Sequence, residues 1–445
     1  MLNQQPTIGI IHNYDLIDEF LESMDLTFPE FCDSFTGSFL FGYIKALQIA
    51  GVRPILFCIT AWVKQPTRLQ HRPTGATICA LPHAPLYHGY RSFKSASLKA
   101  YGAEKGQAFK DVEDDNQIRR LMLTKAKNLL KSGGVYLATP FRMLARELKR
   151  ENCQALLCQE YEYARFDTCV AMGKTINLPV YGCFQGSDET QSFLESGFRR
   201  WALDNCAGLI IASGREIERV KDRYNIPAAK IHQIFNPLNL PVGNKFQKAA
   251  TRKELGIAPK AKVVVWHGRV EMAQKGLDVL IPAWKKICSD RSTEDLKLLI
   301  IGTGSDASKL QQQIASLELS NIIWLDKFIG DRYSFFNDTA TTEIYTLPSR
   351  KEGFPLAPIE AMACELPVVV TEVAGMRDIL PQGEANGGII VPVENFQALA
   401  IAIGRLLDND RLRLKMGVNA KKRTRNCFSL ETIGQQMRKT LIDEE

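Results

Sequence analysis

The sequence predicts an α/β protein of two doubly wound, Rossmann-like domains that face each other across a cleft. Its 445 residues exceed the about 250–300 residues at which a single hydrophobic core stops growing. Short apolar runs alternate with longer helical patterns almost from end to end, which is typical of parallel sheets covered by helices. A stretch with Pro, Gly and Asn near residues 237–250 interrupts this alternation and indicates a linker between the domains.

Each expected element is a short apolar run or a helical pattern. Strands of the first half are expected at residues 8–12, 53–60, 76–81, 155–160, 179–184 and 208–213. Strands of the second half are expected at 263–268, 296–302, 322–326, 344–349, 367–372 and 388–393. Helices are expected at 39–51, 118–133, 277–289, 307–318 and 357–366, and a last helical stretch at 395–445. The predicted domains are therefore residues 1–238 and 239–425, followed by a C-terminal helix at 426–445.

Composition excludes several classes of protein. Hydrophobic residues make up 45% and charged residues 24% of the chain, which excludes collagen-like, mucin-like and disordered chains. A net charge of +7 permits anionic partners without requiring one. Eleven cysteines without a C-x-x-C pair predict reduced thiols in a cytoplasmic protein, with no disulfide framework and no zinc site. The start, MLNQQPTIGIIHN, lacks a basic signal region, and no apolar run approaches the ~20 residues of a membrane span.

The most informative stretch is LPSRKEGFPLAPIEAMACELPVVVTE. A strand is expected to end near Ser349 and a helix to open near Ala357, with Pro358 in its first turn. Glu352 precedes this helix and Glu360 lies within it. Because N–H groups at a helix start attract anions, the spacing predicts a phosphate site flanked by two carboxylates that hold hydroxyl groups. An ordinary turn with an acidic cap is the alternative.

A pair of cations is the second candidate. In VVVWHGRVEMAQKGLDVL, Arg269 follows a strand and Lys275 precedes a helix that begins near Gly276. Two cations at the carboxyl end of a strand can neutralise a diphosphate without a metal. The alternative is a pair of solvated surface charges.

A glycine pattern is the third candidate. Gly302, Gly304 and Ala307 form G-x-G-x-x-A after a strand, and Asp326 ends the next strand. This spacing matches a dinucleotide fingerprint and makes an NAD(P)-dependent oxidoreductase the alternative function. Any tight turn from strand to helix also selects glycine, so the pattern alone is not specific.

In this order the motifs resemble the retaining, family-4 (group 1) glycosyltransferases of the GT-B fold. Their donor-binding domain carries a G-R…K-G element, a strand–G-x-G turn and an E-x7-E motif, whose spacing PSRKEGFPLAPIEAMA has. Downstream, TEVAGMRDILPQGEANGGIIVPVE resembles T-x-x-G-G-x-x-E-I…G-x-L-V-P, with Ala374 and Asp378 in place of Gly and Glu. FNPLNL resembles N-P-x-D, with Asn239 in place of Asp. The resemblance covers most of residues 200–430.

The resemblance implies a hexosyltransferase-like enzyme that moves a sugar from a nucleotide-sugar donor to a glycan, lipid or small-molecule acceptor with retention of configuration. The first domain would bind the acceptor and the second the donor, and the C-terminal helix would pack back on the first domain. Arg269 and Lys275 would hold the donor diphosphate. Glu360 would bind the nucleotide ribose, and Glu352 the donor sugar near the reacting carbon. The resemblance implies no metal and no other cofactor.

Backbone groups complete the implied donor site. N–H groups of the loop before the helix would receive phosphate oxygens, and this loop contains Gly353, Phe354, Leu356 and Ala357. Gly302 and Gly304 would form the G-x-G turn of the donor domain. Gly37 resembles the glycine of an N-terminal loop that lets the backbone approach the diphosphate.

Gln185 is a departure from the resembling family, in which many members have a histidine that faces the donor sugar. Glutamine can hydrogen-bond a sugar hydroxyl but carries no proton between groups. His12, His83 and His88 are further cleft candidates, although a lone histidine is more often structural.

Residues 334–347, SFFNDTATTEIYTL, are unusually polar for a region that is mostly apolar in the resembling family. The string resembles the translation of a common sequencing adapter. We hypothesise that part of it is an assembly artefact in front of a genuine PSRKEGF, and resequencing the source gene tests this.

Two basic stretches and one acidic turn complete the candidates. Residues 118–132 form an amphipathic pattern that could touch an anionic membrane surface, and a core-facing helix with a solvated basic face is the alternative. Residues 421–425, KKRTR, lack the aromatic interleaving of a nucleic-acid site, so no nucleic-acid partner is expected. Residues 408–410 fit a surface turn better than a metal site. The expected location is the cytoplasm, with possible peripheral contact at the inner membrane surface.

Overall fold

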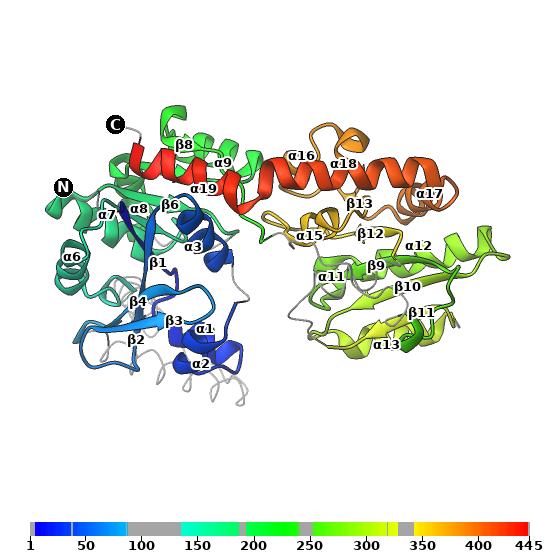
Figure 1. The fold of residues 1–445 in the computed structure, drawn as a ribbon, viewed down its shortest axis with the longest axis horizontal. Coiled ribbons are helices and arrows are strands. Elements are labelled where there is room, and N and C mark those ends of the chain that lie inside the picture. Colours follow the sequence, from blue (N-terminus) through cyan, green and yellow to red (C-terminus); the bar gives the residue numbers. More distant parts are fainter. Residues whose placement is uncertain are drawn as a thin grey trace, which may run out of the picture. The chain divides into compact units, whose positions relative to one another are not determined.

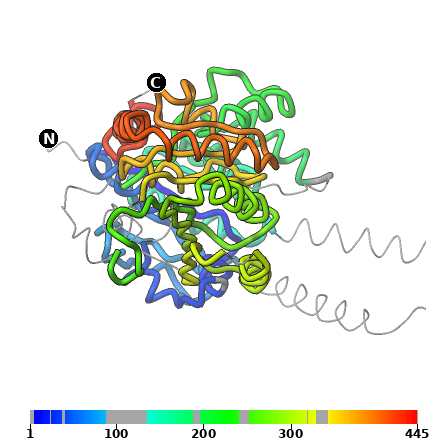
Figure 2. The backbone as a smooth tube through the Cα atoms, turned by 90° about the vertical axis from the view of Figure 1, so that its right-hand side faces the viewer, coloured from blue at the N-terminus to red at the C-terminus, as the bar shows by residue number. Residues whose placement is uncertain are grey.

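A computed structural model describes residues 5–36, 39–85, 87, 135–186, 193–239, 252–317, 319–327 and 342–443. They form two compact units, each built on one sheet (Figure 1). The first unit takes Met1–Ile211, Arg219–His232 and Gln436–Glu445, and the second takes Ala212–Glu218 and Gln233–Gln435. The limits expected from the sequence, residues 238 and 425, lie near these boundaries but not on them. Figure 2 traces the same chain order in colour.

The first unit is built on an eight-stranded sheet in the order β3-β4-β2-β1-β5-β6-β7-β8. Its strands are β1 (Thr7–Ile11), β2 (Arg53–Thr60), β3 (Thr67–His71), β4 (Ala76–Pro82), β5 (Ala155–Cys158), β6 (Val180–Cys183), β7 (Gly208–Ile210) and β8 (Ile231–His232). The six strands predicted for this half are all present. All pairings are parallel except that of β3 with β4. The strand β3 was missed because TRLQH is polar and only partly buried, so it lacks the apolar run that identifies the others.

Six α-helices within the described residues lie wholly in this first unit: α1 (Ile17–Ser23), α2 (Phe28–Asp33), α3 (Phe39–Ile49), α6 (Phe141–Arg150), α7 (Ala164–Ile176) and α8 (Phe193–Asn205). Two more lie in it only in part, α9 (Gly214–Tyr224) and α19 (Leu430–Arg438). Every residue of β1 and of β5 is buried. Burial on both faces is the reason that these parallel strands are continuous apolar runs.

The second unit is built on a six-stranded, wholly parallel sheet in the order β11-β10-β9-β12-β13-β14. Its strands are β9 (Lys262–His267), β10 (Leu296–Ile301), β11 (Ile322–Leu325), β12 (Ile344–Leu347), β13 (Val368–Thr371) and β14 (Gly388–Val391). The six strands predicted for this half are all present. Their residues alternate between two cores. In β9, Val264 and Trp266 belong to one core, and Val263 and Val265 to the other.

Helices cover both faces of this sheet. They are α11 (Met272–Lys275), α12 (Leu277–Asp290), α13 (Ala307–Ser316), α15 (Ala357–Ala363), α16 (Met376–Ile379), α17 (Phe396–Leu407) and α18 (Asp410–Phe428). The core that contains Trp266 is closed by α12 and α17, and the opposite core by α15 and part of α18. Each face therefore buries apolar surface, as a doubly wound sheet requires.

The central strand β12 carries buried hydroxyl groups. It pairs with β9 on one side and β13 on the other, and Thr346 is fully buried. Neither Thr342 Oγ1 nor Thr346 Oγ1 has a hydrogen-bond partner in the described part of the chain. A buried polar group without a partner destabilises a fold. Of the unusual segment at 334–347, residues 334–341 lie outside the described residues.

The C-terminal residues end on the first unit. Tyr181 Oη donates to the carbonyl oxygen of Thr440 at 3.0 Å, and Arg438 Nη1 donates to that of Ala50 at 2.9 Å. Among the described residues, no helix combines the length and the apolar character needed to cross a membrane. Three features singled out from the sequence, Gly37, His88 and residues 118–132, lie outside the described residues.

Candidate functional site

Each sheet has a topological switch point, where neighbouring strands connect outward in opposite directions. In the second unit it lies between β9 and β12, and in the first unit between β1 and β5. Ligands of open α/β sheets bind at the carboxyl ends of such strand pairs. The predicted site residues are therefore expected at these two edges.

In the second unit, an oriented ion pair lies just past β12. Lys275 Nζ is 2.8 Å from Glu352 Oε1, and Ser349 Oγ donates to the same oxygen at 2.7 Å. The side chains of Lys275 and Glu352 are 15% and 11% exposed. The structure thus brings together one predicted cation and one predicted carboxylate. Ser349, which spacing placed only at a strand end, is the residue that orients the carboxylate.

Gly276 makes this pairing possible. It lies directly after Lys275, in the left-handed region with a φ of +65°. A Cβ at this position would collide with the carbonyl oxygen of Pro348. Only glycine lets this turn approach the chain after β12 so closely, and the approach is what puts Lys275 beside Glu352.

The second predicted carboxylate pairs with a residue that the sequence did not single out. His267 Nε2 is 2.9 Å from Glu360 Oε2, and the two residues are 4% and 5% exposed. This contact fixes the orientation of the Glu360 carboxylate. His267 ends β9, and the signal that could have found it is its place directly before the Gly268–Arg269 pair in the sequence.

Arg269 differs from Lys275. Its Nε is 3.0 Å from Glu271 Oε1, and its side chain is 67% exposed. The two predicted cations therefore pair with different carboxylates in the structure. Arg350 is the anchored arginine of this region, because it pairs with Asp278 and Glu394, each at 2.7 Å. These two carboxylates raise the pKa of Arg350.

The G-x-G turn has a structural role that needs no ligand. A Cβ on Gly302 would collide with the carbonyl oxygen of Gly268, and one on Gly304 with that of Val270. The Val270 N–H donates to the carbonyl oxygen of Thr303 at 2.9 Å. Two loops after neighbouring strands therefore pack backbone to backbone, and this packing explains both glycines.

The predicted phosphate loop leads from β12 into α15. Its residues Gly353, Phe354 and Leu356 precede the helix, which begins at Ala357 with proline in its first turn, as predicted. The Phe354 ring stacks on that of Phe235, with centroids 5.5 Å apart. This contact anchors the loop to the chain after β8.

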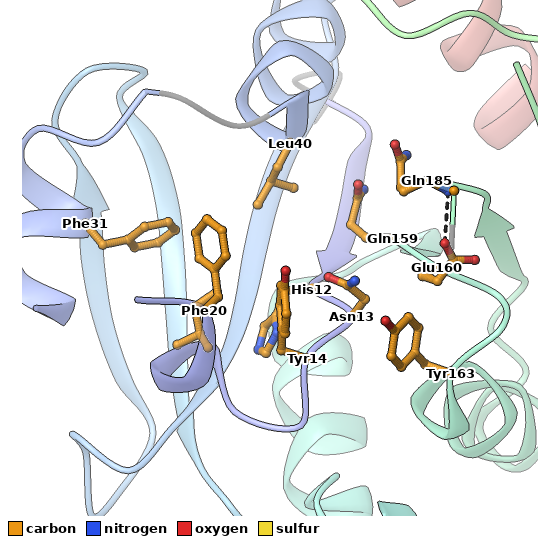
Figure 3. A pocket seen from close by; sticks show the side chains of 12 residues that line it. His12, Asn13, Tyr14, Phe20, Phe31, Leu40, Gln159, Glu160, Tyr163 and Gln185 are labelled. Atoms are coloured by element: carbon orange, nitrogen blue, oxygen red, sulfur yellow. Dashed lines mark hydrogen bonds between the residues drawn. The ribbon is translucent and has the colours of Figure 1, made fainter. Parts of the chain in front are cut away.

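In the first unit, a pocket of about 240 Å³ opens at the switch point. Side chains and backbone from the ends of three strands and from α1, α2 and α3 line it: His12, Asn13, Tyr14, Ile17, Phe20, Phe31, Leu40, Gln159, Glu160, Tyr163, Gln185 and Gly186. Figure 3 shows Phe20, Phe31 and Leu40 toward one side, and Gln185, Glu160 and Tyr163 toward the other. We call this cavity the switch-point pocket.

His12 lines this pocket as a neutral ring. The Ile59 N–H donates to His12 Nε2 at 3.0 Å, and Arg165 Nη1 lies 3.2 Å from the same nitrogen. Burial, and next the charge of Arg165, hold the pKa of His12 well below its usual value. Since Nε2 accepts, the proton of the neutral ring is on Nδ1.

Two further polar residues come from the loops after β5 and β6. Glu160 accepts the backbone N–H of Gln185 at 3.0 Å and that of Glu162 at 3.2 Å. Gln185, the predicted sugar contact, thus lines the pocket. His83 does not line it: its Nδ1 lies 3.0 Å from the carbonyl oxygen of Ala84. The sequence did not single out Gln159, Glu160 or Tyr163, because no spacing pattern links them to His12.

Most of the second unit matches a known protein family. Residues 247–423 match the family model described as glycosyl transferases group 1. The capsular polysaccharide biosynthesis glycosyltransferase CapM of Staphylococcus aureus is 32% identical over 39% of this chain and 44% of its own. The lipopolysaccharide core biosynthesis mannosyltransferase LpsB of Rhizobium meliloti is 29% identical over 42% and 53%. The chain spans about half the length of these relatives.

Solved structures resemble the whole chain. Sucrose-phosphate synthase from Thermosynechococcus elongatus matches with a TM-score of 0.64 and 17% identity, over 97% of each chain. The Anabaena protein HepE in complex with UDP matches with a TM-score of 0.66 and 15% identity, over 98% of this chain and 100% of its own. These likenesses show a GT-B fold. The comparisons give no support to the NAD(P)-dependent alternative.

Proposed function

Residues 247–423 belong to the group 1 glycosyltransferases, and from that premise we propose that the protein is a retaining glycosyltransferase. It transfers a sugar from a nucleotide-diphosphate sugar to a glycan, lipid or small-molecule acceptor. The oriented Lys275–Glu352 pair at a switch point carries this proposal. UDP bound to the structurally similar HepE supports a nucleoside diphosphate as part of the donor.

The proposed chemistry rests on charge that is already positioned. As the sugar–phosphate bond breaks, the leaving nucleotide gains negative charge and the sugar becomes oxocarbenium-like. Lys275 exchanges Glu352 for phosphate oxygens, and the exposed Arg269 turns to the same diphosphate. Side-chain cations then stabilise the leaving group, so we propose that no metal is required.

The two carboxylates take different parts in this proposal. Glu352 lies beside the sugar, where a negative charge stabilises the positive charge that develops at the reacting carbon. Glu360, which His267 holds in one orientation, accepts hydroxyl groups of the ribose. The glycine turn at 302–304 belongs to the same proposed donor site.

We place the acceptor in the first unit, at the switch-point pocket, where Gln185 is the proposed sugar contact. The enzyme acts in the cytoplasm in this proposal, at the inner membrane surface if the acceptor is lipid-linked. Retention of configuration is measured directly by NMR of the anomeric proton in the first-formed product.

The decisive experiment is a metal-free thermal-shift and calorimetric series with UDP, GDP, ADP, NAD and NADP on wild type, Lys275→Ala and Lys285→Ala. Lys285 is an exposed lysine of the same unit and serves as the control. We expect one nucleoside diphosphate to stabilise wild type and Lys285→Ala by about 2.7 kcal/mol at a hundred times its Kd. Lys275→Ala should bind it at least about tenfold more weakly.

Each shift is measured against the unliganded midpoint of the same variant, because Lys275→Ala also leaves Glu352 without its cation. Stabilisation by NAD or NADP alone, unchanged in Lys275→Ala, contradicts the proposal and revives the oxidoreductase alternative.

A further inference from the structure

We infer that the switch-point pocket takes an uncharged, hydroxyl-rich ring, such as a sugar or a cyclitol, and discriminates against acceptor groups that carry phosphate or carboxylate. The inference rests on the proposed function, because it names the chemical class of the acceptor. The volume of the switch-point pocket, about 240 Å³, lies below the ~300–1,000 Å³ of sites for drug-sized ligands. The pocket therefore suits one ring rather than a long chain.

Gln159 is the first observation behind this inference. The residue is 2% exposed, and neither Nε2 nor Oε1 of its amide has a hydrogen-bond partner among the described residues. A buried amide without partners is costly for a protein to keep. A hydroxyl group both donates and accepts, so a polyol can satisfy both ends of this amide at once.

His12 adds a donor of fixed character. Because its Nε2 accepts the Ile59 N–H, its Nδ1 carries a proton, and Nδ1 is buried without a partner in the described structure. The side-chain amide of Gln185 also lines the pocket. The pocket thus offers neutral donors and acceptors side by side, which is the pattern that hydroxyl groups require.

Charge supplies the discrimination. Glu160 is the one charged side chain among the described residues that line the pocket, and it is 2% exposed. The cation behind His12, Arg165, donates to the carbonyl oxygen of Asp15 and is countered by the Asp15 charge. A phosphate in the pocket would therefore lie beside a buried carboxylate, and two like charges repel strongly at low dielectric.

Aromatic side chains form the remaining wall. The rings of Tyr14 and Phe20 lie 5.4 Å apart, and burial raises the pKa of Tyr14, so its hydroxyl stays protonated. Rigid aromatic faces bury the C–H surface of a ring while a tyrosine hydroxyl still makes hydrogen bonds. This wall fits a polyol ring better than it fits a small ion.

The test compares matched neutral and anionic probes on the full chain by calorimetry and saturation-transfer NMR. The neutral probes are myo-inositol and methyl α-glucopyranoside, and the anionic probes are their monophosphates. We expect at least one neutral probe to bind at least about tenfold more tightly than its monophosphate. Gln159→Leu should weaken neutral binding by about tenfold or more, and the same change at the exposed Gln154 should not.

Glu160→Gln removes the charge while keeping the shape, and we expect it to bring the two affinities within about threefold of each other. Tighter binding of a monophosphate by wild type, absence of binding by both neutral probes, or an unchanged Gln159→Leu overturns the inference. Binding of UDP, GDP and ADP is measured in the same variants. If no nucleoside diphosphate binds, the proposed function is contradicted. The ratio of the affinities for the neutral and the anionic probes still tests the inference about the pocket.

Discussion

The two units place their candidate sites at equivalent points of equivalent sheets, yet they equip them with opposite chemistry. Beyond β9 and β12 the side chains form charged pairs, Lys275 with Glu352 and His267 with Glu360, and we call this the charged edge. Beyond β1 and β5 they are mostly amides and tyrosines around one carboxylate, and we call this the neutral edge. The difference teaches that the fold provides an edge where ligands can bind, and that the side chains at the edge decide which ligand.

Glu352→Gln is the change with the largest expected effect, and it tests whether the charged edge is the reacting one. The substitution keeps the shape but removes the negative charge beside the proposed reacting carbon. We expect turnover to fall about 100-fold or more, measured as nucleotide release with the acceptor present. Glu372→Gln, at an exposed carboxylate of the same unit, should keep wild-type turnover. Equal turnover in all three proteins contradicts the assigned role.

Gly276→Ala tests the backbone geometry beneath the charged edge. The substitution adds a collision with Pro348 to the strain of a positive φ, so we expect a loss of about 2–4 kcal/mol in the free energy of unfolding. Gly75→Ala in the first unit has the same φ region with nothing within 4 Å, and about 1 kcal/mol should be lost there. Denaturant unfolding compares the two, and equal losses would show that the close approach is not required.

A pH series tests the neutral edge. Since the pKa of His12 is lowered in the folded state, the unfolded chain binds the additional proton. Stability contributed by this residue is therefore present above about pH 6.5 and is lost as the pH falls toward the folded pKa. We expect wild type to lose about 1 kcal/mol more than His12→Gln between pH 6.5 and 5.5. His83→Gln is the control, and a wild-type slope in His12→Gln would argue against a neutral buried ring.

Thr346→Val is the smallest expected effect and concerns the strand beneath the charged edge. Removing a buried hydroxyl without a partner should raise the free energy of unfolding by about 0.5–1 kcal/mol. Thr371→Val is the matched control, because the Thr371 hydroxyl donates to the carbonyl oxygens of Ser349 and Leu347, and its loss should destabilise. If part of residues 334–347 is an assembly artefact, an unpartnered hydroxyl in the central strand β12 is what it would leave. Recovery of the same codons on resequencing would remove that explanation.

Much of the fold was predictable because its strands are buried on both faces. Each predicted strand was found, and only the polar, partly exposed β3 and the two-residue β8 were added. The charged edge was partly predictable as well, because Lys275, Glu352 and Glu360 each stand in a short sequence motif, although their partners could not be read from it. His267 and Ser349 were missed, since a residue that orients another is recognised only by its contact.

The sequence by itself determined the class of fold, the order of the strands along the chain and the short motifs of the second unit. These depend on local periodicity and on spacings within one loop or helix. Only the tertiary structure decided which cation meets which carboxylate, and that Gln159 and Gln185 share a pocket with His12. Those residues lie far apart along the chain, and parallel strand order, which is a property of the whole sheet, brings their loops to one edge.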